Sequence, residues 1–288
     1  MNEQIKKEIL VAQKNEITEH LIYKKLSESV KDIHNKDVLK KISDDELRHY
    51  NFFKKYTGKD IKPDNLKIGI HFLISKILGI IFTSKLIENM EGKERIVYEK
   101  MSKVVPAIKN IAKDEASHKK SLIGLINEER INYMGSFVLG LNDALVGLTA
   151  ALVGLTFTLQ NTHLVAVTGL IIGLTSALSM AASEYLSTQS EKSDRDPFKA
   201  STYTSFAYIA VVLILNSSFL ILENIYLALG ITILNAILII LMFTFYVSVV
   251  KSVSFKKRFS EMISISLGIA TFSFVLGFLL RKFFNINV

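Results

Sequence analysis

The chain has 288 residues and a formal net charge of +8, with 35 Lys and Arg against 27 Asp and Glu. It contains no cysteine, which excludes disulfides, thiolate metal sites and iron–sulfur clusters. A bound metal would therefore need carboxylate, imidazole, thioether, water or backbone oxygen. Residues 1–134 hold 26 of the basic and 20 of the acidic side chains, and their lysines are not clustered. Without a nucleic-acid motif, this basic surplus indicates attraction to an anionic membrane face rather than nucleic-acid binding.

The first 134 residues predict a charged, soluble, all-α domain. Four helices are expected, at 3–31, 36–57, 68–101 and 105–130. Gly58 and Pro63 mark a connection after the second helix, and Pro106 suits the first turn of the fourth. Residues 68–82 are unusually apolar, but a stretch of about 15 residues is too short to span a bilayer, which needs about 20. This stretch is expected either in a core or subunit contact, or on the membrane surface.

The remaining residues, 135–288, predict a membrane domain. Five apolar segments are long enough to span a bilayer: 136–160, 164–183, 203–222, 225–250 and 262–280. The expected fold class is therefore all-α, with an N-terminal soluble bundle followed by five transmembrane helices. In the first two segments Gly140, Gly147 and Gly154 recur every seven residues, and Gly169 and Gly173 form a Gly-x-x-x-Gly pair. This spacing indicates close helix packing in lipid.

The topology follows from the basic residues between the segments. They gather in two of the four breaks: Lys192, Arg195 and Lys199 in one, and Lys251, Lys256, Lys257 and Arg258 in the other. The positive-inside rule places both breaks in the cytoplasm together with the N-terminal domain, which has no apolar signal segment. A multi-pass protein of the cytoplasmic membrane with its C-terminus outside is expected. Arg281 and Lys282, at the outer end of the last segment, argue mildly against this orientation.

One pattern of charged residues occurs twice in the soluble half. Glu16, Tyr23 and Asp45-Glu46-x-x-His49 are followed in the same order by Glu91, Tyr98 and Asp114-Glu115-x-x-His118. Glu and His at positions i and i+3 of a helix share a face. Di-iron four-helix sites take one glutamate from each of two helices and a Glu-x-x-His from each of the others. The expected ligands of two iron ions are Glu16, Glu46, His49, Glu91, Glu115 and His118, with Tyr23 and Tyr98 hydrogen-bonded to ligand carboxylates.

Several neighbouring residues leave alternatives open. Glu94 is a candidate seventh ligand and Glu88 competes for that role, whereas Glu19 and His20 break the repeat. A single Glu-x-x-His often arises as solvated surface charge. Two copies, each following its glutamate at a separation of 30 or 24 residues, favour a metal site. The arrangement resembles the rubrerythrin and ferritin superfamily over residues 3–130, which implies a ferritin-like four-helix bundle.

The membrane half carries its own candidate residues. Asp143 is the only ionisable group in the first segment. A charge at mid-bilayer costs about 2.5–3.5 kcal/mol on insertion scales, so such a residue normally faces a pathway or a partner. Met180 and Glu184 follow in the second segment, and with Asp143 they would form a mixed site suited to Fe²⁺ or Mn²⁺. The alternatives are that Met180 is packing filler and that Glu184 only marks the helix end at the cytoplasmic interface.

Two membrane segments also resemble a known family. Asn142–Thr149 and Ser179–Leu186 are similar to the first- and second-helix signatures of the vacuolar iron transporters, over residues 135–285. The resemblance implies a dimeric, five-helix proton antiporter that moves Fe²⁺ out of the cytosol. It also implies that Asp143 and Met180 lie on an ion path between two subunits, with Asp143 carrying the coupling proton.

The resemblance has one departure. Plant-type members carry a glutamate-rich insertion after the second helix, whereas the loop at 187–200 contains only Glu191. The N-terminal domain would replace that insertion, and this fused order resembles the membrane-bound ferritin branch of prokaryotic exporters. We therefore expect an exporter of Fe²⁺, or of Mn²⁺ by the same ligand chemistry. The alternative from another class is a membrane-tethered di-iron oxidase or peroxidase, and a third is an iron sensor. Five spans containing Asp143 weigh against a simple anchor.

Overall fold

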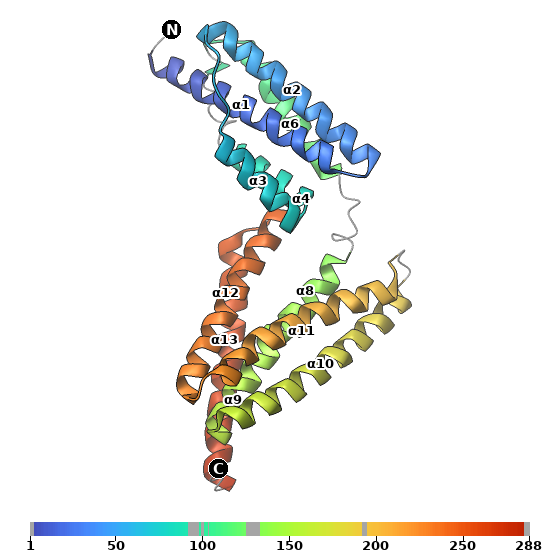
Figure 1. Cartoon of the computed structure of the whole chain (residues 1–288), viewed down its shortest axis with the longest axis vertical. Coiled ribbons are helices and arrows are strands. Elements are labelled where there is room, and N and C mark those ends of the chain that lie inside the picture. Colours follow the sequence, from blue (N-terminus) through green and yellow to red (C-terminus); the bar gives the residue numbers. More distant parts are fainter. Residues whose placement is uncertain are drawn as a thin grey trace. The chain divides into compact units, whose positions relative to one another are not determined.

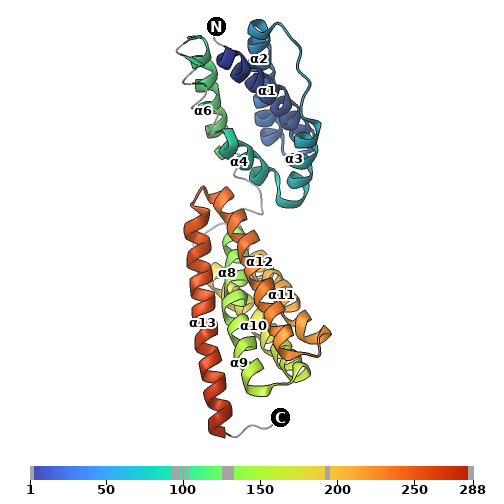
Figure 2. The same ribbon diagram turned by 90° about the vertical axis from the view of Figure 1, so that its left-hand side faces the viewer.

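The computed structural model describes residues 3–91, 98, 101–102, 104–124, 133–191 and 195–284. Across these residues the secondary structure is helical and contains no strand, which confirms the all-α fold class. The chain forms two compact units, unit 1 at Met1–Glu128 and unit 2 at Glu129–Val288 (Figure 1, Figure 2).

Unit 1 is built from helices whose ends are fixed by local hydrogen bonds. They are α1 (Glu3–Ser29), α2 (Ile33–Thr57), α3 (Asn65–Leu78), α4 (Ile80–Glu91) and α6 (Ile108–Gly124). The side chains of Asp32 and Asp64 accept hydrogen bonds from the first turns of α2 and α3. Gly58, with φ 66°, ends α2 and donates its N–H to the Lys54 carbonyl. These caps fix both ends of α2 and the beginning of α3, and α1 and α2 lie close to where the sequence predicts them.

The prediction of a single long helix at 68–101 is wrong. α3 ends at Leu78 and α4 begins at Ile80, because Gly79 adopts φ 94° and ψ 161°, a conformation accessible essentially to glycine alone. An isolated glycine inside an apolar helical pattern does not reveal such a break. Pro106 also differs from its expected place, because it lies in the turn before α6 rather than in its first turn.

The interior of unit 1 combines an apolar cluster with buried charge. α1 and α2 lie side by side along their lengths (Figure 1, Figure 2). The apolar cluster consists of Ile9, Ala12, Phe53, Tyr98, Met101, Val105, Ile108 and Ile111. Further along the same helices the interior is polar, and there the buried residues include Glu16 of α1, Glu46 of α2 and His118 of α6. Buried charged groups are rare unless they are paired or bind metal, so this polar part of the interior is a candidate metal site.

Unit 2 contains the membrane-spanning part of the chain. Its first helix is α8 (Met134–Asp143), which continues through a π-helical turn, η1 (Ala144–Leu148), into α9 (Thr149–Leu159). It is followed by α10 (Thr162–Ser190), α11 (Pro197–Ile221), α12 (Ile225–Lys251) and α13 (Phe255–Phe284). Within the described residues, five helical stretches are long and apolar enough to cross a bilayer, as the sequence predicts.

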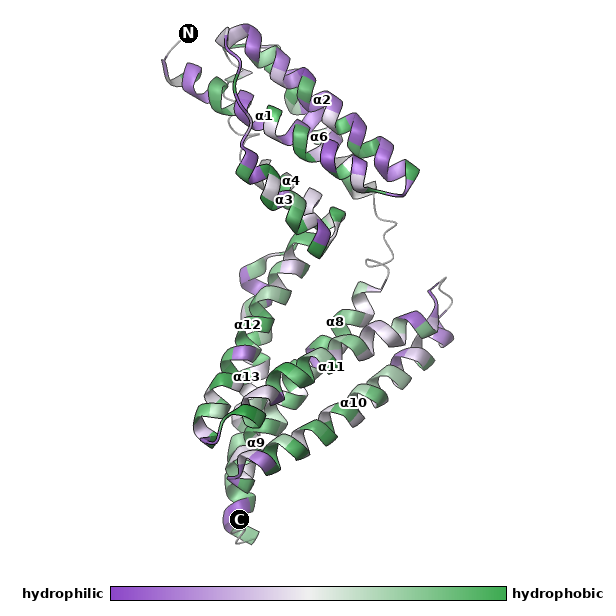
Figure 3. Ribbon diagram, viewed as in Figure 1, coloured by the Kyte–Doolittle hydropathy of each residue, from purple (hydrophilic) through white to green (hydrophobic). Residues whose placement is uncertain are grey.

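The first and third spans are central in unit 2. Within an apolar stretch of 18 residues in each span, 56% of the residues of the α8–α9 span and 50% of those of α11 are buried, against 17% of those of α13. Figure 3 shows these helices to be largely hydrophobic, as expected for helices surrounded by lipid, whereas hydrophilic and hydrophobic residues alternate along α1 and α2. Glycines allow the close contacts: Gly140 faces the backbone of Thr204 on α11, and Gly277 of α13 faces the backbone of Gly154.

Candidate metal centre and membrane carboxylates

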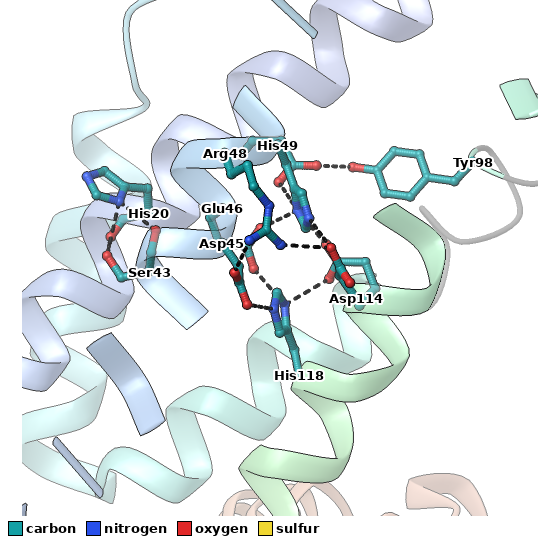
Figure 4. Close-up of polar contacts among 11 residues, drawn as sticks. His20, Ser43, Asp45, Glu46, Arg48, His49, Tyr98, Asp114 and His118 are labelled. Carbon is teal, nitrogen blue, oxygen red and sulfur yellow. Dashed lines mark hydrogen bonds and ion pairs between the residues drawn. The ribbon is translucent and has the colours of Figure 1, made fainter. Parts of the chain in front are cut away.

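Five of the predicted di-iron ligands lie together inside unit 1. They come from three helices, Glu16 from α1, Glu46 and His49 from α2, and Glu115 and His118 from α6 (Figure 4). Four are almost fully buried, with exposed fractions between 1% and 5%, and Glu115 is partly exposed. One ligand atom from each of Glu16, Glu46, His49 and Glu115 lies within 4.8 Å of the others. The side chain of Glu91, like that of Glu88 and the whole of Glu94, lies outside the described residues.

Glu46 and Glu115 each present one oxygen to each histidine. Glu46 Oε2 lies 3.3 Å from His49 Nδ1, and its Oε1 lies 3.1 Å from His118 Nδ1. Glu115 repeats this arrangement, with 3.3 Å to His49 Nδ1 and 3.7 Å to His118 Nδ1. The two imidazole rings are 5.9 Å apart between centroids. Two carboxylates spanning two imidazoles can bridge two metal positions, one beside each histidine.

Two buried atoms of this cluster lack a hydrogen-bond partner among the described residues. They are Glu16 Oε2, 3.4 Å from His49 Nδ1, and His118 Nδ1. Buried polar atoms are nearly always hydrogen-bonded, whereas these two have only ion-pair neighbours, at 3.4 Å for Glu16 Oε2 and at 3.1 Å, from Glu46 Oε1, for His118 Nδ1. Carboxylate oxygens and imidazole nitrogens are ligands that iron and manganese accept, and both atoms face the interior of the cluster. The residues present therefore fit a metal centre.

The aspartate before each Glu-x-x-His contacts the histidine of the other helix. His49 Nε2 lies 3.2 Å from Asp114 Oδ2, and His118 Nε2 lies 3.0 Å from Asp45 Oδ2. Arg48 connects the two aspartates, at 2.7 Å from Asp45 and 2.9 Å from Asp114. These contacts turn both Nδ1 atoms toward the carboxylates (Figure 4). The repeated sequence pattern includes both aspartates, but no role was predicted for them or for Arg48, although that residue stands beside His49.

The tyrosines of the repeat lie in the same interior. The Tyr98 hydroxyl donates a 2.7 Å hydrogen bond to Glu16 Oε1, so a tyrosine of the second repeat orients a glutamate of the first (Figure 4). Tyr23 is fully buried on α1, and its bond to a ligand carboxylate stays a prediction. Glu19 and His20 make other contacts: Glu19 pairs with Lys67 at 3.2 Å, and His20 Nδ1 lies 2.8 Å from the Ser43 carbonyl.

Burial and mutual contact shift the pKa values of the cluster in opposite directions. Burial, together with the charge of Glu46, holds the pKa of Glu16 well above its ordinary value. Burial alone would also raise the pKa of Glu46, but contacts with the two histidines outweigh it and lower that pKa. For His118, burial alone would lower the pKa, yet Glu115 and Glu46 raise it to about 10. Without metal, the imidazoles are thus cations that balance the buried carboxylates.

In unit 2, Asp143 ends α8 and is immediately followed by the π-helical turn. Its side chain is exposed in the single chain and interacts with the hydroxyl of Tyr208 on α11. The neighbouring Asn142 Oδ1 is buried and has no hydrogen-bond partner among the described residues. Single π-turns within α-helices occur frequently at functional sites, and this one was not predictable from the sequence.

The other two membrane candidates differ in their surroundings. Met180 is half-buried and packs against the apolar core of unit 2. Glu184 is 8% exposed, and its Oε1 accepts a 2.5 Å hydrogen bond from Ser136 of α8 and a 3.5 Å bond from Thr188. The described contacts therefore tie Glu184 to the beginning of the first span and Asp143 to α11.

Comparison with known proteins places part of unit 2 in a functional context. Residues 134–196 match the model of the VIT family, the vacuolar iron transporters. The matched stretch contains Asp143, Met180 and Glu184. No match was found among curated proteins, and none among solved structures. Together with the five candidate spans, the family match supports a multi-pass membrane protein that transports iron or manganese.

Proposed function

We propose that the chain exports Fe²⁺, or Mn²⁺, across the cytoplasmic membrane in exchange for protons, and that unit 1 carries a ferritin-like di-iron centre serving this transport. The observation that carries the proposal is the presence, in one chain, of a buried cluster of three glutamates and two histidines and of a five-span unit that matches the VIT family over its first two spans. A buried acidic cluster or a membrane carboxylate also occurs in proteins unrelated to iron, but here both features suit the same class of metal.

The contacts in unit 1 support specific roles. Glu16, Glu46, His49, Glu115 and His118 would hold the two ions, with Glu46 and Glu115 reaching both histidines and Glu16 lying beside His49. By the symmetry of the repeat, Glu91 would join His118, with Glu94 as a further candidate ligand. When bound, such a centre supplies one-electron iron chemistry with oxygen or peroxide as oxidant. The chain's own part is to hold the ligands rigid and dry through Asp45, Asp114 and Tyr98.

In unit 2, Asp143 is proposed to alternate between proton and metal on the transport path. It is an ionisable side chain inside a spanning helix, and such residues normally face a water-filled pathway or a partner. Its exposure in a single chain is consistent with a path completed by a second copy in a homodimer. Met180 would add a soft sulfur ligand to this path. Glu184 would act near its end, through its bond to Ser136.

Transport in proteoliposomes tests the proposal. Purified full-length protein would be reconstituted, and uptake of Fe²⁺ and of Mn²⁺ measured under an imposed pH gradient. Asp143→Asn should abolish uptake, whereas Glu223→Gln, an exposed acidic residue between the third and fourth spans, should leave it unchanged. Glu46→Gln with Glu115→Gln should remove metal bound to unit 1 and reduce uptake. Absence of gradient-dependent uptake by the native chain would contradict transport.

The second candidate function is a tethered di-iron oxidase or peroxidase, favoured by the same buried cluster and its Tyr98 contact. Oxygen or peroxide consumption after Fe²⁺ addition would be measured on full-length Asp143→Asn, in which transport is blocked. Sustained turnover that Glu46→Gln removes would support an enzyme. Stoichiometric metal binding without turnover, combined with flux that depends on occupancy of unit 1, would instead assign unit 1 a sensing role.

A further inference from the structure

Helix α3 carries an exposed apolar stripe that the proposed functions do not use. Eight large hydrophobic side chains of the described part of unit 1 are exposed, and four of them lie on α3. These are Leu66 (74% exposed), Ile70 (47%), Leu73 (60%) and Ile77 (64%). Their spacing of four, three and four residues places them on one face of the helix. We call this set the α3 stripe.

The opposite face of α3 is packed inside unit 1. Ile68, His71 and Ser75 are buried there, so the helix has a defined inner side and the stripe is its outer side. Exposed apolar residues that are scattered singly need no explanation, but a contiguous stripe of four branched aliphatic side chains marks an interaction surface. The apolar character of 68–82 noted in the sequence is therefore only partly explained by the core.

The charges on α3 beside the stripe are positive, and the acidic N-cap residue before it, Asp64, is paired with Lys14 at 3.4 Å. α3 contains no acidic residue, and Lys76 is exposed beside the stripe with its Nζ 5.4 Å from the centroid of the Phe72 ring. Lys25 of α1 is also exposed and lies 5.8 Å from the same ring. Both lysines thus stand at one edge of the α3 stripe. An apolar helix face bordered by lysines is typical of helices that lie in the interface of an anionic membrane.

We propose that the α3 stripe docks on the anionic lipid surface of the membrane that unit 2 spans. Leu66, Ile70, Leu73 and Ile77 enter the boundary between headgroups and acyl chains, while Lys25 and Lys76 extend their ammonium groups to lipid phosphates. The cytoplasmic leaflet is rich in anionic lipid, which attracts such lysines. Because unit 1 is covalently joined to a membrane unit, its local concentration at the bilayer is high and a weak interfacial contact is sufficient.

A second copy of the chain fits the stripe less well. If two α3 helices paired through their stripes, their lysines would meet across or beside the contact, and α3 offers no acidic residue to compensate them. Like charges at such a pairing are unfavourable, whereas lipid phosphates complement them. The inference rests on the proposed membrane location of unit 2 and cytoplasmic side of unit 1, and not on metal binding or transport.

Fluorescence in lipid nanodiscs tests the docking on the full-length protein. Because the chain has no cysteine, a single one can be introduced as Leu73→Cys and labelled with an environment-sensitive dye. Asp37→Cys, at an exposed position of α2, is the matched control. The nanodiscs would contain phosphatidylcholine with phosphatidylglycerol, and a portion of lipid brominated on its acyl chains. A dye at position 73 should shift to shorter wavelength and lose intensity to brominated lipid, whereas one at position 37 should do neither.

A second experiment reverses the charge of the two lysines beside the α3 stripe. Lys25→Glu with Lys76→Glu should abolish the lipid-dependent quenching at position 73, while helical content and the metal content of unit 1 stay as in the parent. Two results would overturn the proposal. One is a dye at position 73 that aqueous iodide quenches and brominated lipid does not. The other is efficient disulfide formation between the thiols introduced at position 73 of two copies without quenching by lipid, which would assign the stripe to a subunit contact.

Discussion

At the scale of single residues, the two repeats of unit 1 support each other crosswise. Asp45 contacts His118, Asp114 contacts His49, and Tyr98 donates to Glu16, so in every case one repeat orients a candidate ligand of the other. A carboxylate that holds a histidine at Nε2 orients Nδ1 toward the other ligands and increases the basicity of the imidazole toward a metal. Substituting an outer residue should therefore affect the metal position on the opposite helix.

Asp45→Asn tests this crossed arrangement. The substitution removes the negative charge next to His118 Nε2 and breaks the ion pair with Arg48, while side-chain size is preserved. We expect metal affinity at the position beside His118 to fall about 10–100-fold, the usual effect of losing such a partner. Competition titration of the full-length chain with a chelator measures it, with Asp37→Asn on the exposed side of α2 as control. Equal affinities in both variants would contradict the assigned role.

His71 should make the stability of unit 1 sensitive to mild acid. It is 5% exposed, its Nε2 has no hydrogen-bond partner among the described residues, and burial lowers its pKa, assisted by the charge of Lys67. The unfolded chain therefore binds this proton more readily than the folded one. Its contribution to stability is complete above about pH 6.5 and is lost as the pH falls below that value.

Thermal unfolding between pH 7.5 and pH 5, in the presence of a chelator, measures this contribution. His71→Gln should lose less stability across that range than the native chain, because carboxylates common to both titrate equally. His34→Gln, at an exposed position of α2, should follow the native chain. Parallel curves for all three proteins would show that His71 is not the responsible group.

At the scale of elements, Gly79 decides whether α3 and α4 are two helices or one. With φ 94° and ψ 161°, an alanine at this position should be strained by about 1–3 kcal/mol. Gly69 is the matched control, because it is helical, exposed and has open space where a Cβ would lie. Gly69→Ala should stabilise the chain by about 0.4–1 kcal/mol. If Gly79→Ala stabilised unit 1 as much in denaturant unfolding, the helix would be continuous, as the sequence pattern predicts.

Two glycines of the first span differ in how closely the neighbouring helix approaches them. A Cβ on Gly140 would lie 2.3 Å from the Thr204 backbone oxygen, so Gly140→Ala must separate α8 from α11. Gly147, seven residues later, has nothing within 4 Å. We expect Gly140→Ala to lower the melting temperature and folded yield in detergent, and Gly147→Ala to leave both unchanged. A destabilised Gly147→Ala would mean that this face is covered, for example by a second copy.

The sequence predicted elements better than it predicted their interruptions. Apolar runs and the polar breaks between them predicted the five spans, and the repeated pattern singled out Glu16, Glu46 and His118, which lie together in the structure. The contacts of Asp45 and Asp114 join residues 73 and 65 positions apart, so they depend on how α2 and α6 pack. The break at Gly79 and the π-turn after Asp143 likewise depend on backbone conformations that the surrounding structure selects.

At the scale of the whole molecule, the distribution of lysine and arginine between the two ends of unit 2 predicts the orientation of the chain in the membrane. The connections before α11 and after α12, together with the helix ends that adjoin them, carry seven basic residues, whereas the outer end of α13 carries two, Arg281 and Lys282. The seven are Lys192, Arg195, Lys199, Lys251, Lys256, Lys257 and Arg258. The short connections after α9 and α11, at 160–161 and 222–224, carry none. By the positive-inside rule the basic ends should be cytoplasmic, together with unit 1.

Cysteine accessibility checks this orientation, because every introduced thiol is unique in the chain. Glu223→Cys and Lys256→Cys, both exposed, report the two ends of unit 2, and Asp37→Cys reports unit 1. A membrane-impermeant maleimide should label position 223 in intact cells, and positions 256 and 37 only after permeabilisation. The reverse result would place unit 1 outside the cell, where neither a cytosolic metal-collecting role nor export from the cytosol is compatible with it. Labelling therefore tests the direction of transport before any flux is measured.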